Sequence, residues 1–285
     1  MSGSASGLAC RTLAIVMLCV LAACAGTPAL PEATAQRLAV ALRARSNVLL
    51  GEVHDNADQH ALRASALRAL LESGARPVLL MEQFDRERQA DLDRALAKPG
   101  VDADAVIDAA GVRPARSGQG WDWPLYRPYI ALAIEYRLRV IAANVSRADT
   151  RRVVSEGLQA MGFAPDVPGD VRATLARSIV DSHCGVLSAA DADRLVPAQV
   201  ARDQFMARMI VAAGTQGAVL LAGNGHVRSD VGVPRWLPAP ARERTLSIGL
   251  LELGGSDDGR YDIIMTTSAQ TRADPCEALG PRPGD

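Results

Sequence analysis

The sequence is poor in lysine, aromatic residues and histidine. Lys98 is the only lysine among 285 residues, aromatic residues make up 4% of the chain, and histidine occurs four times. The formal net charge of −1 gives no excess of positive charge that would attract phosphates, so we expect no nucleic-acid partner. Because these residues are scarce, the segments in which they gather carry most of the information about function.

The N-terminal segment has one basic residue, Arg11, before an apolar run at 12–20. That run is too short for a permanent membrane-spanning helix, which needs about 20 apolar residues, and the pattern is typical of a secretory signal. The residues that follow, Leu21-Ala22-Ala23-Cys24, match the bacterial lipobox. We therefore expect a signal peptide at 1–23, cut before Cys24. The alternative is an ordinary cleavage site beside a chance cysteine.

Lipidation of Cys24 would attach the mature chain to a membrane. The thiol of a lipobox cysteine accepts diacylglycerol, and two or more acyl chains, palmitate among them, anchor a protein stably where one would not. Ala25, rather than aspartate, follows the cysteine, which is typical of outer-membrane sorting in Gram-negative lipoproteins. We expect a lipid-anchored protein of the bacterial cell envelope, at the outer membrane.

Three cysteines remain after such processing: Cys24, Cys184 and Cys276. If Cys24 is acylated, the other two are left as a pair in an oxidising compartment, where disulfides persist. A bond between them would tie the C-terminal tail to the body of the protein. Spacing along the chain does not establish the geometry that a disulfide requires, so this pairing stays open.

The hydrophobic pattern of the mature chain alternates between strands and helices. Continuous apolar runs at 47–52, 77–82, 139–144 and 217–224 are typical of strands buried on both faces of a parallel sheet. Helical periodicity at 57–73 separates the first two runs. This order predicts an α/β fold with a mostly parallel β-sheet flanked by helices.

The long stretch at 146–213 predicts a smaller all-helical subdomain, because it is too long for one crossover between strands. Breaks in its helices are expected near 165–168 and at Pro197. Around it we expect a tether and first helix at 24–45, an α/β domain over 46–270, and a flexible tail at 271–285.

Polar residues follow four expected strands, at the edge where open α/β sheets bind ligands. They are Glu52, His54, Glu82, Asn144, Asn224 and His226. The histidines end matching Gly-x-x-His motifs at 51–54 and 223–226, and glycine lets the backbone approach a ligand closely. His54, Glu82 and His226 form a ligand set known from catalytic zinc sites. The same groups would also serve to orient a large cofactor, or simply to cap backbone amides.

Aromatic residues gather at 120–129, where Trp121, Trp123, Tyr126 and Tyr129 lie. A tyrosine phenolate can ligate ferric haem iron, and the tryptophans would make an apolar wall against a porphyrin. Without further information, the pattern favours a hydrophobic plug that docks the helical part onto the sheet.

His183 and Cys184 are adjacent in the chain. Adjacent side chains on a helix do not face each other, so we do not expect a catalytic cysteine–histidine dyad, and a polar contact between His183 and a ligand is the better interpretation. Arg202 lies on an expected helix, where it would pair with a carboxylate at the site or with an acidic residue on the surface.

Taken together, these motifs resemble the ChaN family of haem-binding lipoproteins. The resemblance runs from about 47 to 237 and rests on Gly51-Glu52-Val53-His54-Asp55-Asn56, Met81-Glu82-Gln83-Phe84-Asp85, Trp121-Asp122-Trp123 through Tyr126, His183-Cys184, Arg202-Asp203 and Ala222-Gly223-Asn224-Gly225-His226-Val227-Arg228. The family is similar to erythromycin esterases and Tiki metalloproteases. That wider group shares the paired Gly-x-x-His motifs and an intervening glutamate, here His54, His226 and Glu82.

The resemblance implies haem bound in a pocket between two monomers. Each iron would be held by one tyrosine, with histidine and lysine from the other monomer contacting the propionates. On this sequence it places the iron ligand at Tyr126, with Tyr129 as second choice, and His183 or His54 near the propionates.

The lysine of that pattern has no obvious counterpart, because Lys98 lies outside the matched motifs. Either Lys98 serves, or an arginine such as Arg127 or Arg202 replaces it, since arginine pairs well with carboxylates.

Two functional hypotheses follow. The first is a lipid-anchored protein that binds haem in iron acquisition, as a homodimer beside an outer-membrane haem receptor. The second is a metal-dependent hydrolase, in which His54 and His226 are ligands or bases and Glu82 is a general base or third ligand.

Overall fold

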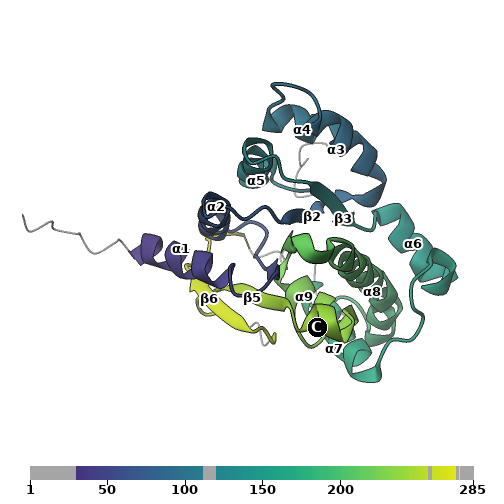
Figure 1. Ribbon diagram of the computed structural model, residues 1–285. Coiled ribbons are helices and arrows are strands. Elements are labelled where there is room, and N and C mark those ends of the chain that lie inside the picture. Colours follow the sequence, from purple (N-terminus) through teal and green to yellow (C-terminus); the bar gives the residue numbers. More distant parts are fainter. Residues whose placement is uncertain (1–29, 112–119, 256–258, 274–275, 277–285) are drawn as a thin grey trace, which may run out of the picture.

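The structure, a computed structural model, describes residues 30–111, 120–255, 259–273 and 276 (Figure 1). The expected signal peptide at 1–23, the lipobox cysteine Cys24 and most of the expected tail lie outside the described residues. Within the described part of the chain, no helix combines the length and the apolar character needed to cross a membrane.

Six parallel strands form one sheet, in the order β3-β2-β4-β1-β5-β6. They are β1 (Asn47–Leu50), β2 (Val78–Asp85), β3 (Val140–Asn144), β4 (Ala218–Leu221), β5 (Thr245–Glu252) and β6 (Ile263–Thr267). The central strands β1 and β4 are buried along their whole length, as expected for a parallel sheet covered on both faces. The predicted α/β fold is therefore confirmed. Leu50 pairs with Leu221, so the segments after β1 and β4 leave the sheet side by side.

Five helices cover one face of the sheet. They are α1 (Leu30–Ala41), α2 (Ala57–Glu72), α3 (Gln89–Leu96), α4 (Ala103–Ala109) and α5 (Trp123–Glu135). Their buried side chains share a core with Val48 and Leu50 of β1 and with Val219 of β4. Successive strand residues point to opposite faces, so Leu49 and Leu220 belong to the core on the other side.

The second face is covered by the C-terminal half of α8 (Ala189–Ala212) and by three short helices. These are α9 (Asn224–Val227), α10 (Val233–Trp236) and α11 (Ala239–Arg242). Met206 and Ile210 of α8 share the core on this side with Leu49 and Leu220 of the sheet. Within the described residues, the connections also contain the 3-10 turns η1 (Arg86–Arg88), η2 (Gln159–Met161) and η3 (Gly214–Gln216).

The stretch predicted as a helical subdomain contains α6 (Arg147–Glu156), α7 (Gly169–Ser182) and α8 (Figure 1). Together, α6, α7 and the N-terminal half of α8 enclose a separate core that includes Val153, Val171 and Val200. Because the other half of α8 packs on the sheet, this helix joins the two cores.

The break expected at Pro197 is wrong, because α8 runs through this residue. A proline inside a helix leaves the carbonyl four residues earlier without its donor. Here the guanidinium of Arg172, on α7, donates to that carbonyl of Asp193 at 3.4 Å. The packing of α7 against α8 thus supplies the hydrogen bond that the proline removes.

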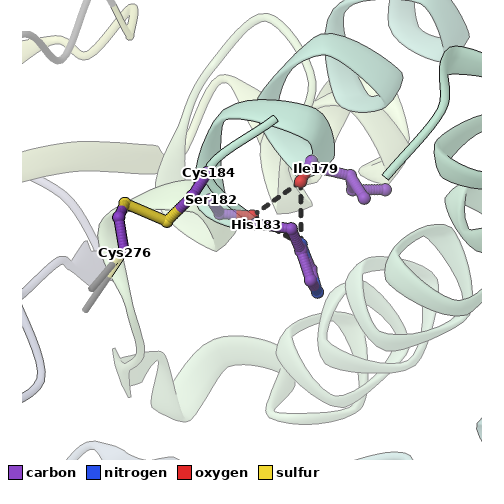
Figure 2. The surroundings of a disulfide bond; sticks show 5 residues. All are labelled: Ile179, Ser182, His183, Cys184 and Cys276. Carbon is purple, nitrogen blue, oxygen red and sulfur yellow. Dashed lines mark hydrogen bonds between the residues drawn. A yellow bond between two sulfur atoms is a disulfide. The ribbon is translucent and has the colours of Figure 1, made fainter. Parts of the chain in front are cut away.

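Cys184 and Cys276 form a disulfide, with their Cα atoms 5.5 Å apart (Figure 2). It joins the end of α7 to the C-terminal segment, a pairing that the sequence left open. The start of the expected tail is held as well, because Arg272 donates to Asp55 at 2.9 Å and to Glu252 at 2.7 Å. This part of the segment is therefore attached to the domain.

Candidate functional site

The residues after β1 form a buried cluster around Glu52. Its carboxylate accepts a hydrogen bond from the Tyr126 hydroxyl at 2.5 Å, lies 2.8 Å from Nδ1 of His54, and forms an ion pair with Arg63. Glu52 and Arg63 are both buried. A buried carboxylate is tolerated when an opposite charge and hydrogen bonds compensate for its lost hydration, and this cluster provides both.

Tyr126 and Tyr129, the predicted iron ligands, lie on α5 with both side chains fully buried. The Tyr129 hydroxyl donates to the backbone carbonyl of His60 at 3.0 Å. Burial raises the pKa of both tyrosines above its ordinary value, which disfavours the phenolate that ligates iron. Together with Trp123 they belong to the core under the sheet, as the interpretation of this segment as a hydrophobic plug predicts.

His226, from the second Gly-x-x-His motif, is the centre of another buried cluster. Its Nδ1 lies 2.6 Å from Oδ1 of Asp203 on α8, and its Nε2 lies 3.3 Å from Oε1 of Glu82 on β2. Burial by itself lowers the pKa of His226, but the two carboxylates outweigh burial and raise the pKa to about 10. The imidazole is therefore a cation at neutral pH, and both its nitrogens are donors.

The two Gly-x-x-His motifs pack against each other because β1 and β4 are neighbours. A Cβ atom added at Gly51 would overlap the side chain of Asn224, and one added at Gly223 would lie 2.7 Å from the His54 ring. Each glycine thus leaves room for a side chain of the other motif. The N–H of Gly223 also donates to Glu82 at 2.8 Å. Close packing of two strand ends therefore accounts for the repeated pattern.

The structure brings His54, Glu82 and His226 to one edge of the sheet but holds them in different networks. His54 is bonded to Glu52, whereas His226 lies between Glu82 and a second carboxylate. Among the residues described, no group of three or more histidine, cysteine or acidic side chains is arranged to hold a metal ion. The metal-ligand set considered from the sequence is thus not assembled here.

The two asparagines of the predicted edge have structural roles. The amide of Asn224 bonds to both backbone groups of Leu250, at 2.6 and 3.1 Å, and so fixes α9 to β5. Asn144 donates to Asp85 at 2.8 Å, which joins the ends of β3 and β2.

An open pocket of about 500 Å³ lies between α6, α7 and α8. Apolar side chains that include Ile179 and Leu195 make part of its lining. Its basic residues come from three elements: Arg147 and Arg151 of α6, His183 at the end of α7, and Arg202 of α8. Gln199 on α8 lies next to both the pocket and the buried cluster, because it lines the pocket and its side-chain amide lies 3.1 Å from the His226 ring.

The three arginines of this pocket have one feature in common. Within the ranges that the structure describes, Arg147, Arg151 and Arg202 have no carboxylate within 4.0 Å. By contrast, Arg152, the next residue on α6, pairs with Glu156 at 3.2 Å. The pocket therefore gathers three guanidinium groups that form no ion pair within the described residues.

Two other residues considered for the propionates lie elsewhere. Arg127 pairs with Asp104 of α4 at 2.9 Å, and Lys98 lines a different hollow of about 480 Å³, beside Arg137. Of the two arginines considered for the propionates, Arg202 lines the pocket that includes His183, and Arg127 does not.

The residues of the α6–α8 pocket fit haem. Its volume lies within the about 300–1,000 Å³ of small-ligand sites, and its apolar side chains suit the macrocycle. Arginine binds carboxylates with charge-assisted hydrogen bonds, so the arginines suit the two propionates. His183 adds a nitrogen donor of the kind that ligates haem iron.

Arg63, His60 and Asp203 complete the buried clusters, and they were not among the site residues predicted from the sequence. Each is a buried polar residue on the apolar face of a helix, α2 or α8. A charged residue that falls in the apolar period of a helix is the signal that could have found them, because such a residue needs a buried partner.

Residues 38–237 match the family described as haem-binding uptake, Tiki superfamily, ChaN. The structure of cofacial haem binding to ChaN of Campylobacter jejuni is similar, with a TM-score of 0.63 and 19% identity over 83% of this chain and 91% of that one. The type III effector HopBA1 is similar at a TM-score of 0.51 and 17% identity, over 83% of this chain and 94% of that one. No curated protein is similar enough in sequence to count as a match.

Proposed function

Because the chain belongs to the ChaN family of haem-binding uptake proteins in the Tiki superfamily, we propose that it binds haem for iron acquisition in the pocket between α6, α7 and α8. The observation that carries this proposal is the set of arginines without a carboxylate partner in the described chain, Arg147, Arg151 and Arg202. An unpaired guanidinium at a pocket binds carboxylates, and haem carries two. Ile179 and Leu195 would contact the macrocycle.

Tyrosine ligation, which the family resemblance implies, would require a rearrangement. Tyr126 would have to break its hydrogen bond to Glu52, and Tyr129 its bond to His60. A buried acceptor left without its donor costs about 1–3 kcal/mol. We therefore place the ligand in the pocket of α6, α7 and α8, where no such bond is broken.

We also infer that two chains share the ligand. The pocket is open to solvent, so a haem in it would keep one apolar face uncovered until a second copy of the chain covers that face. Light scattering with and without haem tests this inference. A haem-dependent doubling of the mass supports a dimer, and a monomer at saturating haem contradicts it.

The expected lipid on Cys24 places this activity at the cell envelope, at the outer membrane beside a haem receptor. The disulfide between Cys184 and Cys276 supports an oxidising compartment. A hydrolase with His226 as base or metal ligand is not favoured, because its raised pKa leaves the imidazole without a free lone pair at neutral pH.

The test is a titration of a protein that comprises residues 25–285 with haem, in which binding is measured by absorption spectroscopy. We expect saturable binding that Arg151→Ala and Arg202→Ala each weaken by a factor of about 10 to 150, because one charge-assisted bond contributes about 1.5–3 kcal/mol. Arg152→Ala is the matched control, since this residue is paired with Glu156. Binding that neither pocket variant weakens would place haem elsewhere, and no saturable binding would overturn the proposed function.

A further inference from the structure

Gln199 of α8 lies between the pocket of α6, α7 and α8 and the buried cluster around His226. Its side-chain amide lies 3.1 Å from Nδ1 and 3.4 Å from Nε2 of the His226 ring. Residues three and four positions apart share one side of a helix, and Leu195, Gln199 and Arg202 all line the pocket. Asp203, four positions after Gln199, contacts the same histidine from within the core. Gln199 therefore belongs to both surroundings.

The His226 ring determines which end of the Gln199 amide should face it. A carboxylate only accepts hydrogen bonds, so Nδ1 donates to Asp203 at 2.6 Å, and Nε2 faces Glu82 at 3.3 Å as a second donor. Burial lowers the pKa of His226, but the two carboxylates raise it to about 10. The ring is therefore a cation without a lone pair for an amide N–H. An amide beside such a cation is more stable with its carbonyl oxygen toward the ring.

This orientation leaves the amide nitrogen of Gln199 for the pocket. The last torsion of a glutamine side chain is broad and roughly two-fold, so half a turn exchanges the oxygen and the nitrogen. With the oxygen toward His226, the NH2 group points away from a buried ring, and Gln199 itself is half-buried and lines the pocket. Within the part of the chain that the structure describes, Gln199 has no side-chain hydrogen bond except those with His226.

We propose that Gln199 is a further ligand-binding residue of this pocket, and that its NH2 group donates to a carboxylate of the ligand beside Arg202. A carboxylate has two oxygens and can accept from an amide and a guanidinium at once. His226, held by Asp203 and Glu82, acts as a positioning residue, because it keeps the amide oxygen on the inner side. This inference rests on the proposed function and deepens it by adding a neutral donor that recognises the propionates.

The test compares ferric haem with haem dimethyl ester, in which both propionates are neutral esters, on a protein that comprises residues 25–285. Absorption titrations measure both affinities. Gln199→Leu should weaken haem binding about tenfold, since it removes a hydrogen bond to a charged acceptor, and should change the affinity for the ester much less. Gln199→Glu keeps an oxygen toward His226 but has no NH2 group, so it should also weaken haem binding. Gln159→Leu, at an exposed position outside the pocket lining, is the matched control and should bind both ligands as the parent does.

A second measurement does not depend on binding of the ester. Gallium protoporphyrin is a diamagnetic analogue of haem, and its addition to 15N-labelled protein should shift the NH2 resonances of Gln199, which are assigned by their loss in Gln199→Leu. Resonances that stay unchanged at saturation would overturn the contact.

The outcomes separate this inference from the proposed function. If Gln199→Leu weakens haem and the ester equally, the residue has only a structural role and the inference is overturned. A haem affinity that neither Gln199 variant changes overturns it as well. In both cases saturable binding of haem by the parent still supports the proposed function, whereas absence of saturable binding in the parent overturns both.

Discussion

The hydroxyl of Tyr126 donates a 2.5 Å hydrogen bond to Glu52 in the interior, where both side chains are buried. The same carboxylate is paired with Arg63 and contacts His54. The tyrosine therefore belongs to the network that neutralises a buried charge, and this network joins α5 and α2 to the end of β1.

Tyr126→Phe should lower the free energy of unfolding by about 1.5–3 kcal/mol, because it removes a hydrogen bond to a charged acceptor. Haem affinity should stay unchanged if the pocket of α6, α7 and α8 holds the ligand. Chemical denaturation and a haem titration measure the two quantities. Tyr136→Phe, at a half-buried position outside this network, is the control. Loss of haem binding in Tyr126→Phe with stability intact would instead support tyrosine ligation.

His226→Gln should destabilise the fold strongly, by about 3–5 kcal/mol, because it leaves two buried carboxylates without their cation. Adding Asp203→Asn removes one of these charges and should recover part of the loss. The double variant should therefore be more stable than the sum of the two single changes predicts. If the free-energy changes of the two single variants simply add in the double variant, His226 and Asp203 do not interact as their 2.6 Å separation implies.

Stability should fall as the pH rises from about 7 to 10. Burial lowers the pKa of His226, but Glu82 and Asp203 outweigh burial and raise it to about 10, above the 6.5 of a free histidine. Because the pKa of His226 is higher in the folded state, its protonation stabilises the folded protein fully below pH 6.5. This contribution to the free energy of unfolding is lost as the pH rises through 10.

Unfolding free energy measured across this range, in the parent protein and in His226→Gln, checks the pH prediction. The slope should be smaller in the variant. Burial raises the pKa of Asp203 to about 6, although the charge of His226 acts in the opposite direction. This carboxyl therefore does not titrate between pH 7 and 10. An unchanged slope would mean that another group is responsible.

Breaking the disulfide should lower the free energy of unfolding by about 2–4 kcal/mol. The bond joins residues that are 92 positions apart and so restricts a long loop of the unfolded chain. Thermal unfolding of the parent protein with and without a reductant measures this effect. The Cys184→Ser/Cys276→Ser double variant should match the reduced protein and should not respond to the reductant. A response in the double variant would assign the effect to something other than this bond.

Cys24→Ser should prevent lipid attachment, because serine has no thiol to accept diacylglycerol. Expression of the full chain in a Gram-negative host with radiolabelled palmitate tests this expectation. Cys19→Ser, a cysteine of the apolar run, is the matched control and should keep the label. A label that persists in Cys24→Ser would show that the lipid is attached to another residue. An unlabelled parent protein would contradict lipid attachment.

Which residues meet in the pocket could not be predicted from the sequence. His183 and Arg202 were each identified as ligand contacts, but so was Arg127, which the fold pairs with Asp104 on α4. Arginines on several helices look alike in a sequence, because the local pattern shows which face of a helix is polar and not which helix lies opposite. The packing of α6 and α7 against α8 determines which arginines lie beside His183.

By itself the sequence determined the parallel sheet, because buried runs such as 47–50 and 218–221 must be covered on both faces. It also determined that polar residues follow these strands at one edge. Only the tertiary structure decided that Tyr126 is buried against Glu52, and that two carboxylates keep His226 charged. Burial and charge pairing depend on which side chains surround a group in space, and those neighbours come from distant parts of the chain.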